Sequence, residues 1–130
     1  MVSAVTIETG LTAALTLCVS EADTALAWRS GDVPVLGTPR LIALCEEAAI
    51  TALAGHLVEG TTTVGLSVRL DHLHPVAIGS TVKAEASLDR IEGRRLVFPV
   101  TAHDDRGIVA AGKVTRVVID REAFLAKSGA

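Results

Sequence analysis

The chain has 130 residues, a mass of 13.5 kDa, a formal net charge of −3 and an isoelectric point near 5.7. Hydrophobic residues make up 49% of it and aromatic residues only 2%, with a mean hydropathy of +0.46. The acidic balance and the scarcity of aromatic rings argue against a partner that is nucleic acid or an anionic membrane. The length suits one core, so residues 1–130 are expected to form a single domain.

No apolar run approaches the roughly 20 residues that a membrane-spanning helix needs. The first ten residues lack the basic flank and apolar core of a signal peptide. Cys18 and Cys45 have no partner at a metal-binding spacing and are predicted to be buried thiols. We therefore expect a cytoplasmic protein without a metal or a cofactor. The apolar excess in so small a chain indicates that a second subunit completes part of the core, which predicts a homodimer.

The first half of the chain predicts a strand followed by helices. β-branched and apolar residues favour a strand at residues 11–19, and Ser20 suits the start of a short helix at residues 20–28. Residues 30–34 predict a loop. Thr38 and Pro39 mark the start of a long helix over residues 37–57, because a threonine hydroxyl can cap free backbone N–H groups and proline is tolerated at the first helical position.

The second half changes to the period of strands. Residues 64–72 alternate, which predicts one face with Val64, Leu66, Val68, Leu70 and His72 and an opposite face that includes Gly65. Further strands are predicted at residues 81–91, 94–104 and 107–120, joined as a meander. Pro99 lacks a donor for the ladder, so its strand is expected at an edge or with a bulge. The order predicts an α+β fold in which a curled antiparallel sheet of about five strands wraps around one long central helix.

Glu46 is an unusual residue in this pattern. At 100° per residue it shares a helix face with Ile42, Ile50, Leu53 and Leu57, whereas Glu47 falls on a polar stripe. Burying a lone carboxylate costs several kcal/mol unless it is paired or hydrogen-bonded. Glu46 could be such a paired structural residue. His72 lies on the strand face that turns toward the helix, and an imidazole beside a carboxylate in a dry cleft is a plausible general base.

The pattern of Gly37-Thr38, Glu46, Gly65 and His72, followed by EGRRL and TAHD, resembles the fluoroacetyl-CoA thioesterase-like branch of the hotdog-fold thioesterases. The resemblance extends over residues 11–127 and implies hydrolysis of an acyl-CoA thioester by a homodimer. It implies catalytic roles for Thr38, Glu46 and His72. It also implies substrate contacts by Gly65, at the acyl pocket, and by Gly37.

One feature of that family has no counterpart in this sequence. Residues 30–37 hold no aromatic residue that could act as a gate over the acyl group, and Trp28 is the nearest. Weak selectivity for a fluorinated acyl group is therefore expected, with a preference for short acyl chains because Gly65 and helix alanines suggest a confined pocket. Coenzyme A phosphates could be held by arginines at the rim, since guanidinium matches phosphate geometry; the candidates are Arg94, Arg95, Arg116 and Arg121.

Other interpretations stay open at this stage. His72 and His74 form an HxH motif that could bind Zn²⁺, but no third ligand stands at a diagnostic spacing. Thr38 could be a helix cap instead of a catalytic hydroxyl, since both would occupy the same place. A non-catalytic dimer that binds or senses acyl-CoA would keep the same fold. Hydration of an enoyl thioester is a third possibility, although the Asp/His motif of a hydratase is missing around residues 72–75.

Overall fold

The computed structural model describes residues 7–129. Residues 1–6 and 130 lie outside the described part of the chain. The predictions made for these residues, as part of a single domain over residues 1–130 and as part of the first ten residues, lie outside it as well. The elements in chain order are β1 (Thr12–Cys18), the 3-10 helix η2 (Glu21–Asp23), α1 (Thr38–Ala52), β2 (Thr61–His72), β3 (Thr81–Ser87), β4 (Arg90–Glu92), β5 (Arg95–Asp104), β6 (Gly107–Asp120) and α2 (Arg121–Lys127). None of these helices is long and apolar enough to cross a membrane.

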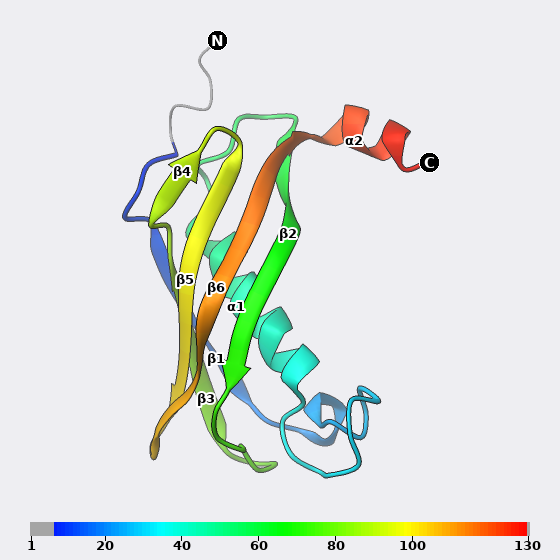
Figure 1. Cartoon of the computed structure of the whole chain (residues 1–130), viewed down its shortest axis with the longest axis vertical. Helices are drawn as coiled ribbons and strands as arrows, with labels where there is room; N and C mark the ends of the chain where they lie inside the picture. Colours follow the sequence, from blue (N-terminus) through cyan, green and yellow to red (C-terminus); the bar gives the residue numbers. More distant parts are fainter. Residues whose placement is uncertain (1–6, 130) are drawn as a thin grey trace.

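The strands form one antiparallel sheet that lies against α1 (Figure 1). The order across the sheet is β1-β3-β5-β6-β2, and the short β4 pairs with β5 beyond the end of β3. The strands β3, β5 and β6 follow one another as the predicted meander, and β2 joins the outer side of β6. The predicted α+β architecture is confirmed, with β4 as a sixth strand.

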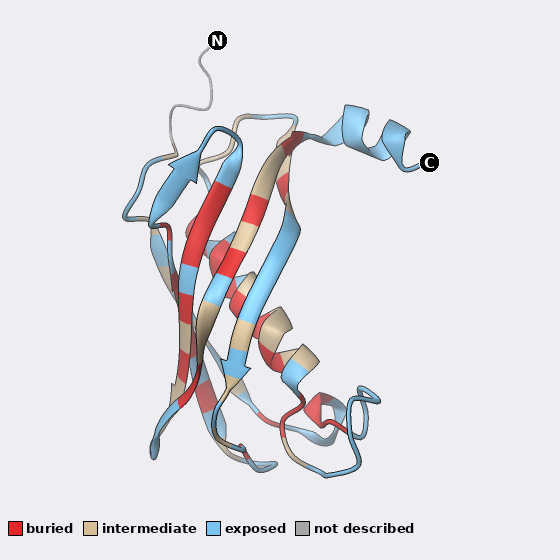
Figure 2. Ribbon diagram, viewed as in Figure 1, coloured by how far each residue is buried: buried red, intermediate tan, exposed pale blue. Residues whose placement is uncertain are grey.

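The core lies between α1 and the inner face of the sheet (Figure 2). The buried stripe of α1 is mostly small or aliphatic, which lets the helix approach the strands closely: Leu41, Leu44, Cys45, Ala48, Ala49 and Ala52. Burial raises the pKa of the Cys45 thiol to about 11, so this cysteine is protonated and inert at neutral pH. The prediction of a second buried thiol is wrong, because Cys18 is exposed at the end of β1, which is an edge strand.

Two predicted helices are shorter than expected. The long helix was predicted to reach residue 57 but ends at Ala52, because Leu53 turns its N–H back to the carbonyls of Ile50 and Thr51 and Gly55 adopts a positive φ of 82°. Leu57 therefore does not share the face of Glu46. The helix predicted at residues 20–28 is reduced to the single turn η2, followed by a loop in which Arg29 has a φ of 59°.

A bulge in β2 changes which residues face the helix. The pairing with β6 shifts between Gly65 and Ser67, so that Gly65 lies opposite Arg116 while Val68 lies opposite Val114. Because one residue is added to the strand, Gly65 and His72 point to the same face although they are an odd number of residues apart. The simple alternation that placed Gly65 on the opposite face from His72 is therefore wrong.

Pro99 lies inside the sheet and not at an edge, since β5 is flanked by β3 and β6. The ladder from β3 reaches only as far as Val100, and the ladder from β4 begins at Val97. Pro99 therefore occupies the gap between two neighbouring ladders, where a missing backbone donor costs nothing on that side.

Candidate active site

Thr38 and His72 lie in contact at one end of α1. The Thr38 hydroxyl oxygen is 2.8 Å from Nδ1 of His72. Thr38 is the first residue of the helix and His72 is the last residue of β2, so both are held by regular structure. The helix cap is Gly37, and within residues 7–129 no side chain caps the helix, so the Thr38 hydroxyl is bonded to the imidazole and not to backbone N–H groups.

The environment of His72 favours the neutral imidazole. Burial lowers its pKa below the ordinary value of 6.5, because desolvation disfavours the charged ring. With the proton on Nε2, Nδ1 can accept the hydrogen bond from Thr38. Nε2 itself is buried and has no hydrogen-bond partner within the described residues. The pair is thus arranged as a hydroxyl beside a base.

A cavity of about 380 Å³ opens beside this pair. It is bordered by the loop that precedes α1 and by the segment that follows β2, including Ala25, Val35, Leu36 and His74. Within the described part of the chain, its lining includes no Phe, Tyr or Trp side chain. Trp28 is turned aside, since its indole Nε1 donates to the carbonyl of Ala22 at 2.9 Å.

Glu46 lies in a different place, next to the bulge of β2. Its Oε2 accepts from Nη1 of Arg116 at 3.1 Å, and its side chain is 30% exposed. A Cβ added to Gly65 would lie only 2.7 Å from this oxygen, so any other residue here would displace the end of the Glu46 side chain. Within the chain, the group that approaches Gly65 closely is thus the Glu46 carboxylate, and the contact of Gly65 with a substrate acyl group stays a prediction.

Arg116 is almost fully buried and anchors Glu46 to the sheet. Its Nε and Nη2 donate to the hydroxyl and the carbonyl of Thr63 at 2.9 and 3.0 Å. Burial lowers its pKa, and Glu46 opposes that shift by stabilising the cation. The suggestion that Arg116 holds a coenzyme A phosphate at the rim is therefore wrong. Its alternation with Val114 on β6 was a signal in the sequence that it faces inward.

The structure does not bring Glu46 to the Thr38–His72 pair within one chain. Glu46 follows Thr38 by eight residues, about 12 Å along the helix axis. It borders a second cavity of about 430 Å³ together with Ile50, Gly65 and Arg116. Glu46 is also less buried than expected, because it flanks the buried stripe and its neighbour Ile50 is 48% exposed.

The two remaining predicted substrate residues lie at opposite ends of the sheet. Gly37 adjoins Thr38. A Cβ added to Gly37 would lie 3.0 Å from Cα of Ala25, so the backbone of Ala25 packs directly against the backbone of Gly37. Arg94 is exposed and its Nε donates to the carbonyl of Val118. Val118 is eight residues along β6 from Ala110, the partner of His72, which is about 26 Å of strand. Arg94 is therefore far from the Thr38–His72 pair of the same chain.

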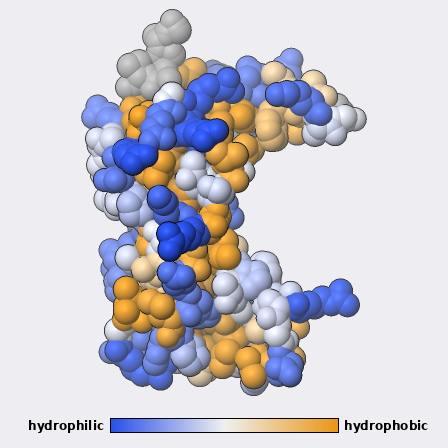
Figure 3. Space-filling model, viewed as in Figure 1, coloured by the Kyte–Doolittle hydropathy of each residue, from blue (hydrophilic) through white to orange (hydrophobic). Residues whose placement is uncertain are grey.

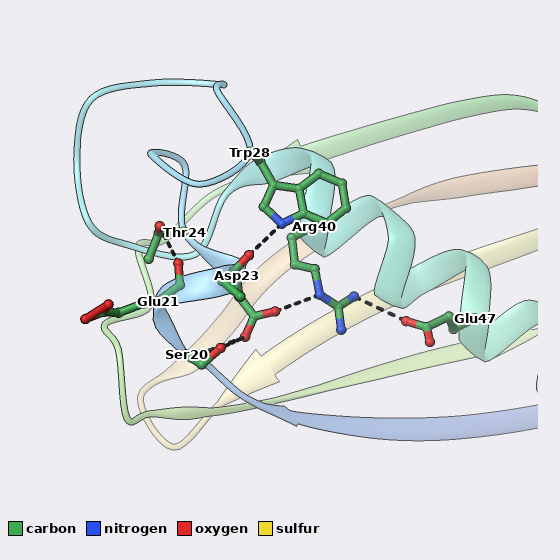
Figure 4. A network of polar contacts seen from close by, with 8 residues as sticks. Ser20, Glu21, Asp23, Thr24, Trp28, Arg40 and Glu47 are labelled. Atoms are coloured by element: carbon green, nitrogen blue, oxygen red, sulfur yellow. Dashed lines mark hydrogen bonds and ion pairs between the residues drawn. The ribbon is translucent and has the colours of Figure 1, made fainter.

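A polar network holds the loop before α1 against the helix (Figure 4). Arg40, two residues after Thr38, donates to Asp23 Oδ1 at 2.9 Å and to Glu47 at 3.2 Å. The backbone N–H and the hydroxyl of Ser20 both donate to the other oxygen of Asp23, whose pKa is lowered by these bonds and by Arg40 against the effect of burial. This network keeps the first turn of α1, and with it Thr38, in place.

His74 lines the same cavity as His72, and its buried Nε2 has no hydrogen-bond partner within the described residues. Within residues 7–129 no three or more His, Cys, Asp or Glu side chains are grouped so that they could hold a metal ion. The structure offers no third ligand for the HxH motif in that part of the chain.

Comparison with known proteins identifies relatives of this chain. A family model described as fluoroacetyl-CoA-specific thioesterase matches residues 19–122. A fluoroacetyl-CoA thioesterase of Streptantibioticus cattleyicolor is 36% identical over 93 residues, which are 72% of this chain and 67% of that protein. A solved structure of the fluoroacetyl-CoA thioesterase FlK has a TM-score of 0.88 and 28% identity, covering 94% of this chain and 95% of that one. A hot-dog-like protein from Thermanaerovibrio acidaminovorans also reaches 0.88, at 27% identity, covering 95% and 91%.

The fold and these relatives define a class: the protein is a thioester hydrolase with the hotdog fold. The chain belongs to the fluoroacetyl-CoA-specific thioesterase family. The family resemblance drawn from Gly37-Thr38, Glu46, Gly65 and His72 is thereby confirmed, while the roles of these residues stay predictions.

Proposed function

We propose that the protein hydrolyses small acyl-CoA thioesters and that Thr38, Glu46 and His72 form its site. The observation that carries the proposal is the 2.8 Å contact between the Thr38 hydroxyl and Nδ1 of His72 beside a cavity. A neutral imidazole can take a proton from a hydroxyl or from a water that the hydroxyl positions. Hydrolysis then adds water across the thioester and releases the free acid and the coenzyme A thiol.

The N–H groups at the start of α1 can stabilise the negative charge that develops on the substrate in this reaction. In a helix the first N–H groups have no partner within the helix, and here Thr38 and Arg40 carry such groups while Pro39 has none. Their position beside the Thr38–His72 pair suits a thioester carbonyl oxygen that becomes negative in the tetrahedral intermediate. Thr38 would act either as the nucleophile or as the donor that positions the substrate and water.

Glu46 joins this site in our proposal through a homodimer. Within one chain it is about 12 Å from Thr38 along the helix. Two large hydrophobic side chains are exposed in this region: Ile50 of α1, which lines the cavity beside Glu46, is 48% exposed, and Leu66 of β2, which follows the lining residue Gly65, is 50% exposed. Figure 3 shows hydrophobic surface along the β2 edge, between α2 and the loop that precedes α1. A second copy that covers this surface would bring its own Glu46 to the first chain's Thr38–His72 pair.

The size of the cavity beside the Thr38–His72 pair supports a substrate with a short acyl group. Its volume of about 380 Å³ is at the small end of ligand pockets, and the part of it that the structure describes contains no aromatic gate. We expect acyl chains of about two to six carbons to be preferred, since each buried methylene contributes about 0.8 kcal/mol until the pocket is full. Discrimination between acetyl and fluoroacetyl thioesters is expected to be weak. Arg94 as a phosphate contact, and the cytoplasm as the location, stay predictions.

A panel of acetyl-, fluoroacetyl-, butyryl-, hexanoyl- and palmitoyl-CoA tests the proposal. Released coenzyme A is measured by chromatography, because the exposed Cys18 would itself consume a thiol reagent. We expect turnover with the short chains and a minimum at palmitoyl. Saturable binding without release would identify the alternative, a dimer that binds acyl-CoA without hydrolysing it. A maximum at palmitoyl would contradict the confined pocket, and strong fluoroacetyl selectivity would contradict the inference from the missing gate.

A further inference from the structure

The turn between β5 and β6 reaches the segment that follows His72. In the sequence, residues 104–107 indicated only a hairpin turn. In the structure Nη2 of Arg106 donates to the carbonyl of Pro75 at 2.8 Å, across 31 residues of chain. A guanidinium donor makes this bond stronger than one between neutral groups. Pro75 lies three residues beyond His72, so the turn and the candidate base are physically linked.

Arg106 is itself held by a buried carboxylate. Its backbone N–H donates to Oδ1 of Asp104 at 2.9 Å, and its Nη2 lies 3.5 Å from Oδ2 of the same residue. The Asp104 side chain is only 2% exposed, whereas that of Arg106 is 55% exposed. The N–H of Arg106 lowers the pKa of Asp104, and the guanidinium of Arg106 adds to this effect against the opposite effect of burial. The carboxylate is thus ionised and fixes the direction of the guanidinium.

The segment contacted by Arg106 connects both members of the Thr38–His72 pair. At one end it begins with His72, and the next residue, Leu73, donates its N–H to the carbonyl of Val109. At the other end the carbonyl of Val76 accepts from the N–H of Leu36, two residues before Thr38. Pro75 lies between these ends. A displacement of Pro75 would therefore be transmitted toward the imidazole at one end and the start of α1 at the other.

We propose that Arg106, oriented by Asp104, is a positioning residue that sets the contact between Thr38 and His72. The inference rests on the proposed function for its effect on catalysis. Arg106 is not among the described residues that line the cavity beside the pair, and its bond to Pro75 is the contact through which it would act. A misplacement of reacting groups by about 1 Å can cost about 100-fold in rate. Loss of the Arg106 bond therefore reduces kcat by at least about 10-fold. Because Pro75 also lines the cavity, a change in KM is expected beside the loss, and kcat is the quantity that tests the positioning role.

The test compares Arg106→Ala with Asp105→Ala. Asp105 belongs to the same turn, is exposed and has no side-chain bond to residues 72–76, so it is a matched control. We expect Arg106→Ala to lower kcat for the best acyl-CoA, Arg106→Lys to restore part of it, and Asp105→Ala to behave as the wild type. If circular dichroism shows that Arg106→Ala does not fold, the kcat values of Arg106→Lys and Asp104→Asn are compared with that of Asp105→Ala instead. Equal kcat in wild type and Arg106→Ala, or an equal loss in Asp105→Ala, would overturn the proposal.

A second readout needs no substrate. The imidazole nitrogens of His72 are observed by NMR and assigned with His72→Ala. We expect Arg106→Ala to change the Nδ1 signal that reports the Thr38 bond, and Asp105→Ala to leave it unchanged. If the wild type released no coenzyme A, the proposed function would fail and this signal would decide the positioning role alone. An unchanged His72 spectrum in Arg106→Ala would then refute it.

Discussion

The hydroxyl of Thr38 lies 2.8 Å from Nδ1 of His72, and this bond joins the first turn of α1 to the last residue of β2. The imidazole is neutral at physiological pH because burial lowers its pKa. Glu46, the third proposed residue, is paired with Arg116 about 12 Å further along the same helix. Within one chain, Glu46 is therefore separated from the Thr38–His72 pair. This separation leads to distinct predictions for Glu46, for the dimer and for His72.

Replacing Glu46 with glutamine is expected to lower kcat by more than about 100-fold, as for the loss of a group that acts on the proton transfers. The change keeps the size of the side chain beside Gly65 and removes its charge. Glu47→Gln is the control, because the Glu47 side chain is 54% exposed and a glutamine oxygen can still accept its bond from Arg40, which leaves the network before α1 in place. Steady-state kinetics with the best short acyl-CoA distinguish the two. Near-normal turnover by Glu46→Gln would remove this residue from the site.

A mixture of two inactive variants tests whether the site is shared between subunits. When Glu46→Gln and His72→Ala chains are unfolded together and refolded, half of the dimers are mixed, and each has one site with an intact Glu46 and an intact His72. Recovery of roughly a quarter of the wild-type activity is expected, since one of the two sites in each mixed dimer is complete. Refolded single variants serve as controls. No recovery, despite mixed dimers shown by mass spectrometry, would place the complete site within one chain.

The pH dependence follows from the lowered pKa of His72. The base is active when neutral, so kcat/KM is expected to rise with pH through a midpoint below 6.5 and to be level above neutrality. The same lowered pKa makes the folded state less stable in acid. Above pH 6.5 the contribution of His72 to the free energy of unfolding is constant. As the pH falls below 6.5 stability is lost, because the imidazole takes up a proton in the unfolded state before it does so in the folded state. A profile of kcat/KM with its acid midpoint above 6.5 would be inconsistent with a buried neutral base.

Assembly is expected to cover the exposed apolar side chains of α1 and β2. Ile50 and Leu66 are about half exposed in the single chain, and β2 is an edge of the sheet that has no neighbour on its outer side within the described residues. Multi-angle light scattering at micromolar concentration is expected to give twice the chain mass of 13.5 kDa, or four times that mass for a dimer of dimers. Leu66→Lys is expected to shift the mass toward the monomer. A wild-type mass of 13.5 kDa would contradict the dimer.

The sequence predicted much of the fold because its periods change clearly, from the helix that starts near Thr38 to strands after residue 60. It predicted the opening of α1 correctly but misjudged its end, since a turn at residues 53–55 decides where the helix stops. The bulge at Gly65 was missed because an extra residue in one strand is defined only by pairing with β6.

The candidate site could be predicted only in part. Glu46 and His72 stood out as titratable residues in apolar patterns, but periodicity cannot give the distance between two elements. Arg116 was misjudged as a surface residue, although its alternation on β6 pointed inward; its pairing with Glu46 depends on the same bulge that turns Gly65 toward the helix. The role of Arg106 depends on a contact between a turn and a distant segment, for which no local pattern exists.

The role of His72 in hydrolysis is tested by the rate of coenzyme A release by the wild type and by His72→Ala, measured side by side with the best short acyl-CoA. We predict turnover by the wild type and a loss of more than about 100-fold in the variant, since His72 is the proposed base. Both proteins are expected to give the same circular dichroism spectrum. Equal rates in the two proteins would remove His72 from the site, and saturable binding by the wild type without any release would show that the protein is not a thioester hydrolase for these substrates.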